Sequence, residues 1–354
     1  MEIAILDILK KAIEKEASDV YIVAGGPACL KINGKIEQYG SERLTDLDTK
    51  RLVEELYSYN TVGNIHKLLK DGDDDFSISV KDLGRFRCNT YKQRGSLACV
   101  LRVVRFDLPV FSELNIPEKI MEFADFKKGL VLVTGPAGSG KSTTLASIID
   151  KINTNYSRHI VTIEDPIEFI HRHKKSIVSQ REVELDTENY GKALRAALRQ
   201  SPDVVLLGEM RDFETIQTAI TAAETGQLVL STLHTVGAAK TIDRIIDVFP
   251  ASSQQQVKIQ LSMVLQAVIS QQLIPSTDGG LVPAFEIMIC NSAIRNMIRE
   301  GKVHMMDNMI YAGVNEGMVT MDTSILKLYN EGRISREDAL FYATNKETIE
   351  KKLI

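Results

Sequence analysis

Residues 130–142, LVLVTGPAGSGKS, decide the fold of this chain. The apolar run Leu130–Thr134 predicts a buried strand, and the glycine-rich turn after it leads into a predicted helix beyond Gly140. The turn fits the pattern G-x-x-x-x-G-K-[ST] in the strand–turn–helix context that a phosphate-binding P-loop requires. A glycine-rich turn without function is the alternative, and the agreement of pattern and context argues against it.

The residues of this turn are the first candidate binding site, and their chemistry predicts ATP and Mg²⁺ as cofactors. Backbone N–H groups of the turn surround phosphates, and the helix N-terminus adds positive potential. Lys141 is expected to reach the β- and γ-phosphate oxygens, and the Ser142 hydroxyl to bind Mg²⁺. The candidate nucleotide-binding residues are Gly135, Pro136, Ala137, Gly138, Ser139, Gly140, Lys141 and Ser142.

Beyond the P-loop, the sequence alternates between apolar runs and helical patterns. Ile160–Ile163, Val204–Leu207 and Leu228–Ser231 are continuous apolar runs typical of central parallel strands. Helices are predicted between them at Glu188–Gln200 and Phe213–Thr225. We therefore expect a doubly wound α/β sheet, followed after about residue 250 by a mostly helical extension.

Two acidic residues after predicted strands are candidate catalytic groups. Glu209 follows Val204–Leu207, so the strand should deliver its carboxylate to the sheet edge that holds the P-loop. Because Gly208 stands before it where a generic Walker B has Asp, Glu209 should contact the metal through water, polarise the attacking water, or both. Glu164, at the end of Ile160–Ile163, is expected beside the phosphates as a base or as a ligand of metal-bound water. The structural alternatives are a helix-capping Glu209 and a charged turn at Glu164.

The histidines supply one further catalytic candidate. His234 follows Leu228–Ser231 at the same edge, which predicts an imidazole near the γ-phosphate as a sensor or hydrogen-bond donor; a purely structural histidine is the alternative. His171 and His173 lie among arginine and lysine residues. Adjacent cations disfavour a divalent ion and no Cys or carboxylate completes a ligand set, so no metal site is expected there.

The first 105 residues predict a separate α+β domain, and the aperiodic stretch Arg105–Pro109 indicates a linker. We expect domains at 1–105 and 116–354, joined by residues 106–115. The first helix should pack through Ile3, Leu6, Leu9 and Ile13. The other elements predicted for this domain are strands at Val20–Val23, Cys29–Ile32, Phe76–Val80, Phe86–Tyr91 and Leu97–Val104, and a helix at Asp46–Tyr57.

Arginines in this first domain have two interpretations. Arg87 and Arg94 lie at predicted strand or loop positions, where they are either solvated or functional. If subunits form a ring with the nucleotide between neighbours, such arginines act in trans on the developing phosphoryl charge.

Composition limits the classes of function. The formal charge of −4 provides no general electrostatic footprint for nucleic acid. The four cysteines match no zinc pattern and no compact disulfide framework, which fits a reducing cytoplasm. The N-terminus carries Glu2 and Asp7 where a signal peptide would be basic, and no apolar run reaches the roughly 18 residues that span a bilayer. We expect a soluble protein whose membrane role, if any, goes through a partner.

Four motifs follow one another in a specific order. GPAGSGKS (135–142), TIEDPIEF (162–169), LLGEMRD (206–212) and STLHT (231–235) resemble the Walker A, Asp box, Walker B and His box of the secretion-superfamily ATPases. Within that group, nearly the whole chain resembles the PilT-type pilus retraction ATPases, from Ala17–Val20 to the retraction signature Ala293–Glu300. In that signature Ile294, Met297 and Ile298 share one helix face, so an ordinary packed helix is the alternative.

The resemblance implies a PAS-like N-terminal domain, a RecA-like ATPase domain and a homohexamer at the inner face of the cytoplasmic membrane. It implies docking onto the inner-membrane platform protein at the pilus base. A pilus assembly ATPase and an accessory retraction ATPase are the functional partners it suggests, and no direct contact with nucleic acid is expected.

The resemblance also carries roles over to individual positions. It implies that Lys141, Ser142 and Thr143 bind phosphate and Mg²⁺. The residues it implies for hydrolysis are Glu164, Glu209 and His234, with Arg87 and Arg94 as contacts from a neighbour.

Two positions depart from the family pattern, Ala137 where Thr is frequent and Val236 where Asn is common, and neither removes a catalytic group. The tetracysteine zinc site usual in pilus assembly ATPases is missing from the sequence, which favours retraction. The alternatives are an assembly or accessory retraction ATPase, a DNA-uptake or conjugation ATPase, and a nucleotide-dependent scaffold that does not hydrolyse ATP. The choice between Glu164 and Glu209 as general base stays open at this point.

Overall fold

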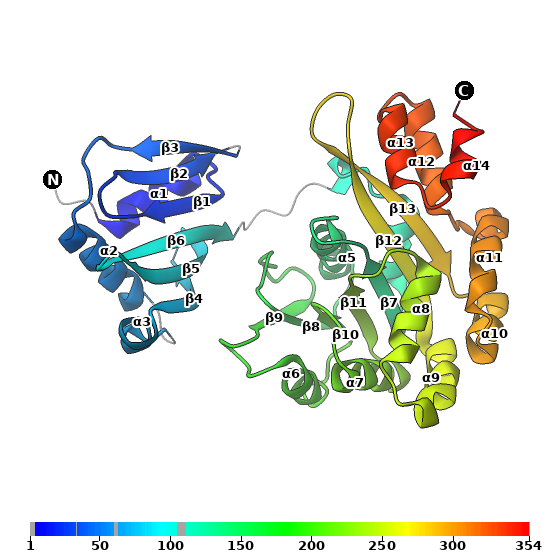
Figure 1. Ribbon diagram of the computed structural model, residues 1–354. Helices are drawn as coiled ribbons and strands as arrows, with labels where there is room; N and C mark the ends of the chain where they lie inside the picture. Colours follow the sequence, from blue (N-terminus) through cyan, green and yellow to red (C-terminus); the bar gives the residue numbers. More distant parts are fainter. Residues whose placement is uncertain (1–3, 33, 60–62, 82, 105–110, 354) are drawn as a thin grey trace. The chain divides into compact units, whose positions relative to one another are not determined.

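The computed structural model describes residues 4–32, 34–59, 63–81, 83–104 and 111–353 (Figure 1). The chain divides into two compact units, Met1–Asp107 with Glu168–Ile170, and Leu108–Ile167 with His171–Ile354. Residues 105–110 of the expected linker lie outside the described residues. The rest of that stretch includes a 3₁₀ helix, η1 (Phe111–Glu113), and its Phe111 and Leu114 pack against the core of the second unit.

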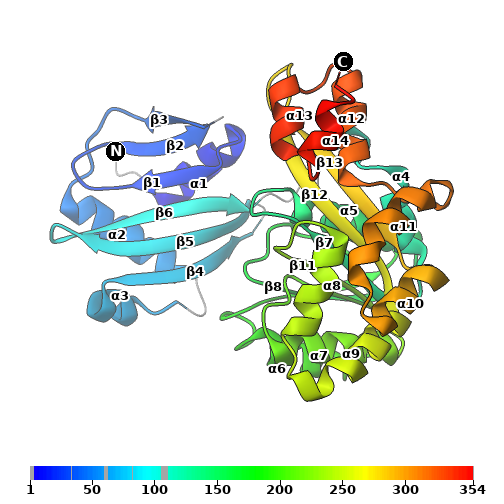
Figure 2. The same cartoon turned by 45° about the vertical axis from the view of Figure 1, so that its right-hand side comes forward.

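The first unit is an antiparallel sheet in the order β3-β2-β1-β6-β5-β4. Helices α1 (Ile5–Glu14) and α2 (Asp46–Ser58) pack on one face of it (Figure 2), and α3 (Ile65–Asp71) lies against β4. Thr45 and Asp48 cap α2 reciprocally, which explains why this polar segment begins a helix. The strands are β1 (Asp19–Ile22), β2 (Ala28–Ile32), β3 (Lys35–Tyr39), β4 (Asp73–Val80), β5 (Gly84–Gln93) and β6 (Ser96–Val104).

The prediction for the first helix is confirmed for Leu9, but the other residues that it buries are not the ones predicted. Ile5, Ile8, Leu9 and Ala12 are fully buried, whereas Leu6 and Ile13 are only half-buried. Ile3 lies outside the described residues. Both faces contain apolar residues at helical spacing, so the sequence pattern alone did not separate them. Strand β3 and helix α3 were not predicted from the sequence.

The second unit is a seven-stranded sheet in the order β13-β12-β7-β11-β10-β8-β9. All neighbouring pairs are parallel except β12 and β13. The central strands are buried on both faces, as in β7, where Leu130–Val133 have no exposed surface. The strands are β7 (Gly129–Thr134), β8 (His159–Glu164), β9 (Ile177–Glu182), β10 (Val204–Leu207), β11 (Leu228–Leu233), β12 (Leu265–Pro275) and β13 (Leu281–Ile289).

Helices cover both faces of this sheet. Helices α4 (Glu118–Met121), η2 (Glu122–Asp125) and α5 (Lys141–Asn155) share one hydrophobic core with it. The opposite core contains α6 (Tyr190–Ala197), α7 (Phe213–Glu224), α8 (Ala238–Asp247), α9 (Ala251–Val264), α10 (Ser292–Glu300), η3 (Val303–Met305) and α11 (Met306–Ala312). The short η4 (Gly313–Glu316) follows α11. A third, smaller core joins the far end of β12 and β13 to α12 (Met321–Asn330), α13 (Arg336–Tyr342) and α14 (Lys346–Glu350).

The expectation of a mostly helical chain after residue 250 was wrong for residues 265–289. This segment forms two long strands of the second sheet, and β12 pairs in parallel with β7 next to the P-loop. Most of β12 is buried, so it lacks the alternation that marks a half-exposed strand. Among the residues that the structure describes, no helix has the length and apolar character needed to cross a membrane.

Candidate nucleotide and hydrolysis site

Four parallel strands bring the four sequence motifs to one edge of the second sheet. Because their carboxyl ends point the same way, the P-loop after β7, His234 after β11, Glu209 after β10 and Glu164 at the end of β8 share that edge. The spatial order differs from the chain order. Strand β8 is three strand spacings, about 14 Å, from β7. Of the four strands, β8, which ends at Glu164, is therefore the furthest in the sheet from the P-loop strand.

The P-loop is a cradle that accepts only glycine at two places. Gly135 and Gly140 have positive φ values of 144° and 87°. A Cβ atom at Gly135 would meet the carbonyl oxygen of Gln271 at 2.2 Å, and one at Gly140 would meet Nε2 of Gln271 at 2.8 Å. The Thr144 hydroxyl donates to Oε1 of Gln271 over 2.7 Å. Strand β12 therefore supports the loop from behind.

Polar groups of the loop are arranged for an anion. Nζ of Lys141 donates to the carbonyls of Gly135 (3.0 Å) and Pro136 (2.9 Å), so the ammonium group is held within the loop. The buried Ser139 hydroxyl has no hydrogen-bond partner among the described residues. Ser142 and Thr143 are half-buried in the first turn of α5, whose N-terminus adds positive potential. Pro136, Ala137 and Gly138 form the exposed tip.

Glu209 is buried, with 7% of its surface exposed, and its two carboxylate oxygens differ. Oε1 pairs with Nη2 of Arg211 at 2.5 Å, and this bond raises the pKa of Arg211. Oε2 is 3.5 Å from Nε2 of His234 but has no hydrogen-bond partner among the described residues. A buried carboxylate oxygen without a donor is costly, and a metal-bound water or a substrate water would satisfy it.

Glu164 is held by neighbours on its own edge. The Thr162 hydroxyl donates to Oε1 of Glu164 over 2.6 Å, and Nε2 of Gln180 donates to the same oxygen over 3.3 Å. These bonds fix the carboxylate at the end of β8.

Hydrogen bonds also tie the loops of this edge together. The Gly208 N–H donates to the carbonyl of Ile163 (2.8 Å), and the Thr232 hydroxyl donates to the carbonyl of Gly208 (2.6 Å). The Met210 N–H in turn donates to the carbonyl of Thr232 over 3.1 Å. The backbone around Glu209 is thus bonded to the strands on both sides of β10.

The remaining candidates lie elsewhere. Arg87 is exposed on β5, and Arg94 is exposed in the turn between β5 and β6, both in the first unit. His171 is buried, which lowers its pKa to about 4, and Nδ1 of His173 accepts from the Val178 N–H at 3.0 Å. Burial of His171 and the backbone hydrogen bond of His173 fit structural roles for both histidines.

Sequence reasoning missed three supporting residues. Arg211 stands two positions after Glu209 within the quoted Walker B motif, so its spacing was a usable signal. Gln271 and Tyr190 gave no signal. Gln271 contacts the P-loop from β12, and the Tyr190 hydroxyl, from the start of α6, lies 2.9 Å from the position that a Cβ atom at Gly208 would take.

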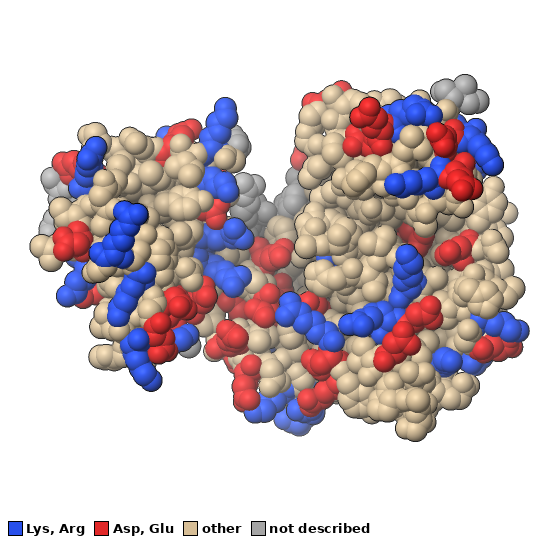
Figure 3. Space-filling model, viewed as in Figure 1, with Lys and Arg blue, Asp and Glu red and all other residues tan. Residues whose placement is uncertain are grey.

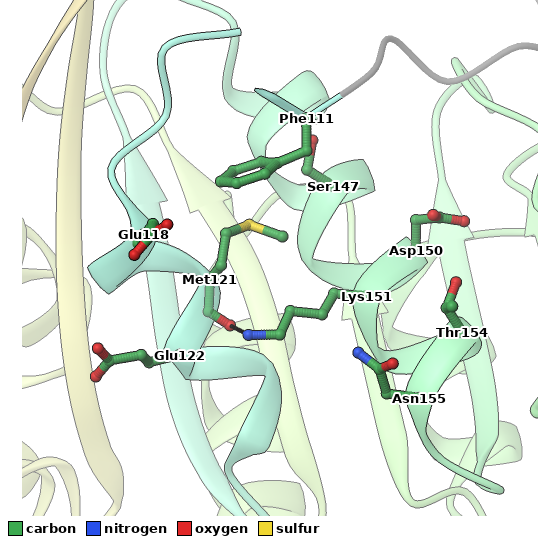
Figure 4. Close-up of a pocket in the computed structure, with 9 residues that line it drawn as sticks. All are labelled: Phe111, Glu118, Met121, Glu122, Ser147, Asp150, Lys151, Thr154 and Asn155. Atoms are coloured by element: carbon green, nitrogen blue, oxygen red, sulfur yellow. Dashed lines mark hydrogen bonds between the residues drawn. The ribbon is translucent and has the colours of Figure 1, made fainter. Parts of the chain in front are cut away.

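A separate pocket of about 480 Å³ lies between α5 and the segment that contains η1, α4 and η2, and it contains none of these candidates (Figure 4). Phe111, Met121 and Lys151 line it, and Nζ of Lys151 donates to the carbonyl of Met121 over 3.0 Å. Its acidic residues include Glu122, paired with Lys119, and Asp150, paired with Lys174. This pocket is therefore separate from the nucleotide and hydrolysis site.

The fold and this edge define a class of protein. A mostly parallel sheet with a P-loop after one strand and a buried carboxylate after a nearby strand is the arrangement of a RecA-like P-loop ATPase.

Comparisons with known proteins narrow the class to a family. The family model described as "Type II/IV secretion system protein" matches residues 1–352. The "Type IV pilus retractation ATPase PilT" of Pseudomonas aeruginosa is 45% identical over 335 residues, 95% of this chain and 96% of that protein. The "Twitching motility protein" of Neisseria gonorrhoeae is 41% identical over 350 residues, 98% of this chain and 92% of that protein. The "Crystal Structure of the Pilus Retraction Motor PilT and Bound ADP" matches with a TM-score of 0.91 at 47% identity, covering 99% of this chain and 100% of that one.

The chain belongs to the Type II/IV secretion system protein family and, within it, to the PilT-type pilus retraction ATPases. It is a nucleotide-binding ATPase with a RecA-like fold. These findings confirm the family and the fold class expected from the order of the motifs.

Proposed function

We propose that this chain is the subunit of a hexameric motor in which ATP hydrolysis powers the retraction of type IV pili and hence twitching motility. The observation that carries the proposal is the Glu209 carboxylate, which lies at the P-loop edge of the sheet with one buried oxygen that no described residue hydrogen-bonds. Similarity to retraction ATPases over nearly all of both chains supports the pilus assignment.

In this proposal the P-loop binds the nucleotide phosphates. Backbone N–H groups of residues 135–140 surround the phosphates, and Lys141 exchanges its carbonyl partners for β- and γ-phosphate oxygens. Thr143, at the start of α5, adds a further phosphate contact.

The residues present also fit Mg²⁺. The Ser142 hydroxyl stands in the first turn of α5, and the unpartnered oxygen of Glu209 is available to a metal-bound water. Bound Mg²⁺ would neutralise phosphate charge as hydrolysis proceeds. A test that does not depend on activity is Mn²⁺ binding followed by electron paramagnetic resonance, in which Ser142→Ala should weaken binding in the presence of ADP.

Hydrolysis then depends on the groups around Glu209. We assign the general-base role to Glu209, because β10 is closer than β8 to the P-loop strand. Arg211 orients its Oε1, and His234 stands 3.5 Å from Oε2 as a donor toward the γ-phosphate. Glu164, fixed by Thr162 and Gln180, is the second carboxylate of the edge and holds water there.

Family membership supports the partners proposed here. We propose a ring in which Arg87 and Arg94 act on a neighbour's nucleotide, located in the cytoplasm beneath the inner-membrane platform protein, with pilus assembly and accessory retraction ATPases as functional partners. On the face shown in Figure 3, Lys and Arg side chains of the second unit are interspersed with Asp and Glu, which does not favour a nucleic-acid partner.

A second candidate is an accessory retraction ATPase. The chain is also 39% identical to the "Type IV pilus ATPase PilU" of Pseudomonas aeruginosa over 95% of its length. In that case deletion of the gene would leave most retraction intact.

The deciding experiment is deletion of the gene in its source organism, with complementation by wild type, Glu209→Gln, or the control Glu188→Gln. Glu188 is an exposed carboxylate paired only with Lys192 among the described residues. Excess surface pili without twitching, rescued by wild type and by the control but not by Glu209→Gln, is the expected result. Loss of surface pili would replace retraction with assembly, and unchanged twitching would favour the accessory role.

A further inference from the structure

Gly208 immediately precedes Glu209, and the space around it is already filled. Its backbone lies outside the left-handed region, so conformation alone would accept a side chain there. A Cβ atom at this position would lie 2.9 Å from the Tyr190 hydroxyl, 3.3 Å from the carbonyl of Ile163 and 3.4 Å from Cα of Glu164. The tightest of these contacts is with a side chain from another element.

The Gly208 backbone is held so that it cannot move away from this contact. Its N–H is bonded to β8 through Ile163, and its carbonyl is bonded to β11 through Thr232. Tyr190 is equally constrained, because it is the first residue of α6 and its ring packs against the core beneath the sheet. The hydroxyl of Tyr190 therefore occupies the volume that a side chain at position 208 would need.

The surroundings of this hydroxyl keep it protonated. Burial raises the pKa of Tyr190 well above its ordinary value, and the charges of Glu209, Asp165 and Glu164 raise it further, whereas Arg211 acts in the opposite direction. A neutral phenol beside carboxylates is a hydrogen-bond donor. The Glu209 oxygen that lacks a donor lies at the same edge.

We propose that Tyr190 is a positioning residue of the hydrolytic site, whose hydroxyl takes the place of a side chain at position 208 and donates toward the Glu209 carboxylate through one water. The inference rests on the proposed role of Glu209. It explains why this Walker B sequence has Gly where Asp is usual: an aspartate at 208 and the hydroxyl at 190 exclude one another.

The first test does not depend on activity. The thermal unfolding of the full chain is measured for Gly208→Ala, Tyr190→Phe and the double variant. Gly208→Ala should lower the Tm by roughly 3–10 °C, because the added methyl group overpacks the contact. In the Tyr190→Phe background the same change should cost less than half as much, because the closest atom is gone.

Gly313→Ala is the matched control. A Cβ at Gly313 would meet Sδ of Met318 at 2.7 Å, so it is also crowded, but by a residue unrelated to Tyr190. Its effect on the Tm should be the same in the wild-type and the Tyr190→Phe backgrounds. If Gly208→Ala alone does not fold, recovery of folding in the double variant is the expected result. Equal cost of Gly208→Ala in both backgrounds would overturn the proposal.

The second test measures turnover. Tyr190→Phe should lower kcat by about tenfold with the KM for ATP unchanged, the loss of one hydrogen bond that orients Glu209. Added to Glu209→Gln, it should have no further effect on kcat, since it acts through that carboxylate. An unchanged kcat in Tyr190→Phe would overturn the positioning role. If instead Glu209→Gln itself turns over normally, the proposed role of Glu209 fails, and the stability cycle still reports separately on Tyr190.

Discussion

In the first unit, neighbouring residues of one strand have different surroundings, whereas in the second unit they do not. Phe86 of β5 is fully buried and Arg87 is exposed, because helices cover only one face of that sheet. In β7, Leu132 and Val133 are both fully buried, because helices cover both faces. The role of a residue thus depends on its face in the first sheet and on its position along the strand in the second, where polar groups gather at the carboxyl ends.

The strongest test of this comparison is at a strand end of the second sheet. Glu209→Gln should lower ATP turnover by about 10²–10⁴-fold while nucleotide binding persists, because only the proton-accepting group is lost. Lys141→Ala should weaken both, since it removes the phosphate contact. Phosphate release and the fluorescence of a labelled nucleotide measure the two properties. A fully active Glu209→Gln protein would show that Glu209 is not the general base.

The face rule of the first sheet is tested by two adjacent residues. Phe86→Ala should destabilise the first unit by about 3–5 kcal/mol, because it leaves a cavity in the core. Arg87→Ala should change stability by less than about 0.5 kcal/mol. Urea unfolding measures both. If Arg87 acts in trans, its variant loses turnover without losing stability, and comparable destabilisation by the two changes would break the comparison.

A buried histidine of the second unit that is not among the site candidates should affect stability. Burial lowers the pKa of His171 from 6.5 to about 4, so the unfolded chain binds this proton more readily. The stabilisation is fully present above pH 6.5 and is lost as the pH falls toward 4, by roughly 3 kcal/mol in total. Urea unfolding from pH 4.5 to 7.5 should show a smaller pH dependence for His171→Asn than for wild type.

The smallest expected effect separates two arginines of α10. Arg295 donates to the carbonyls of Ser262 (2.7 Å) and Met263 (3.0 Å) at the end of α9, so Arg295→Ala should cost about 1–3 kcal/mol. The exposed Arg299 donates only to Asn296 among the described residues, and Arg299→Ala should cost less than about 0.5 kcal/mol. Melting and twitching are measured together. Loss of twitching without loss of stability in Arg299→Ala would mark that side chain as a partner contact. Equal destabilisation by the two changes would contradict the assignment of a structural role to Arg295 and not to Arg299.

The strands and loops that carry the motifs could be predicted because their signals are local. The apolar runs before Gly135, Glu209 and His234 each form a strand. The motif residues that follow these strands lie at the expected edge of the sheet. The order of the strands in the sheet could not be predicted from local patterns, because strand pairing joins residues that are far apart in the chain. The position of Glu164, at the end of β8 and separated from β7 by β11 and β10, therefore could not be predicted.

The missed elements have a similar cause. Helix α9 ends at Val264 and β12 begins at Leu265, so no glycine or proline marks the change. The support that Gln271 gives to Thr144 and the contact of Tyr190 with Gly208 exist only after the sheet has assembled. No local pattern encodes such contacts.

Gln271 also limits how this chain can change over generations. Two features exclude any other residue at Gly135 and Gly140. Both have positive φ values, and atoms of Gln271 fill the space that a Cβ atom would need. Thr144 and Gln271 are bonded through their side chains, so a lineage can replace either one without loss only by replacing both. Among descendants of this chain, positions 144 and 271 should vary together, whereas positions 135 and 140 should not vary at all.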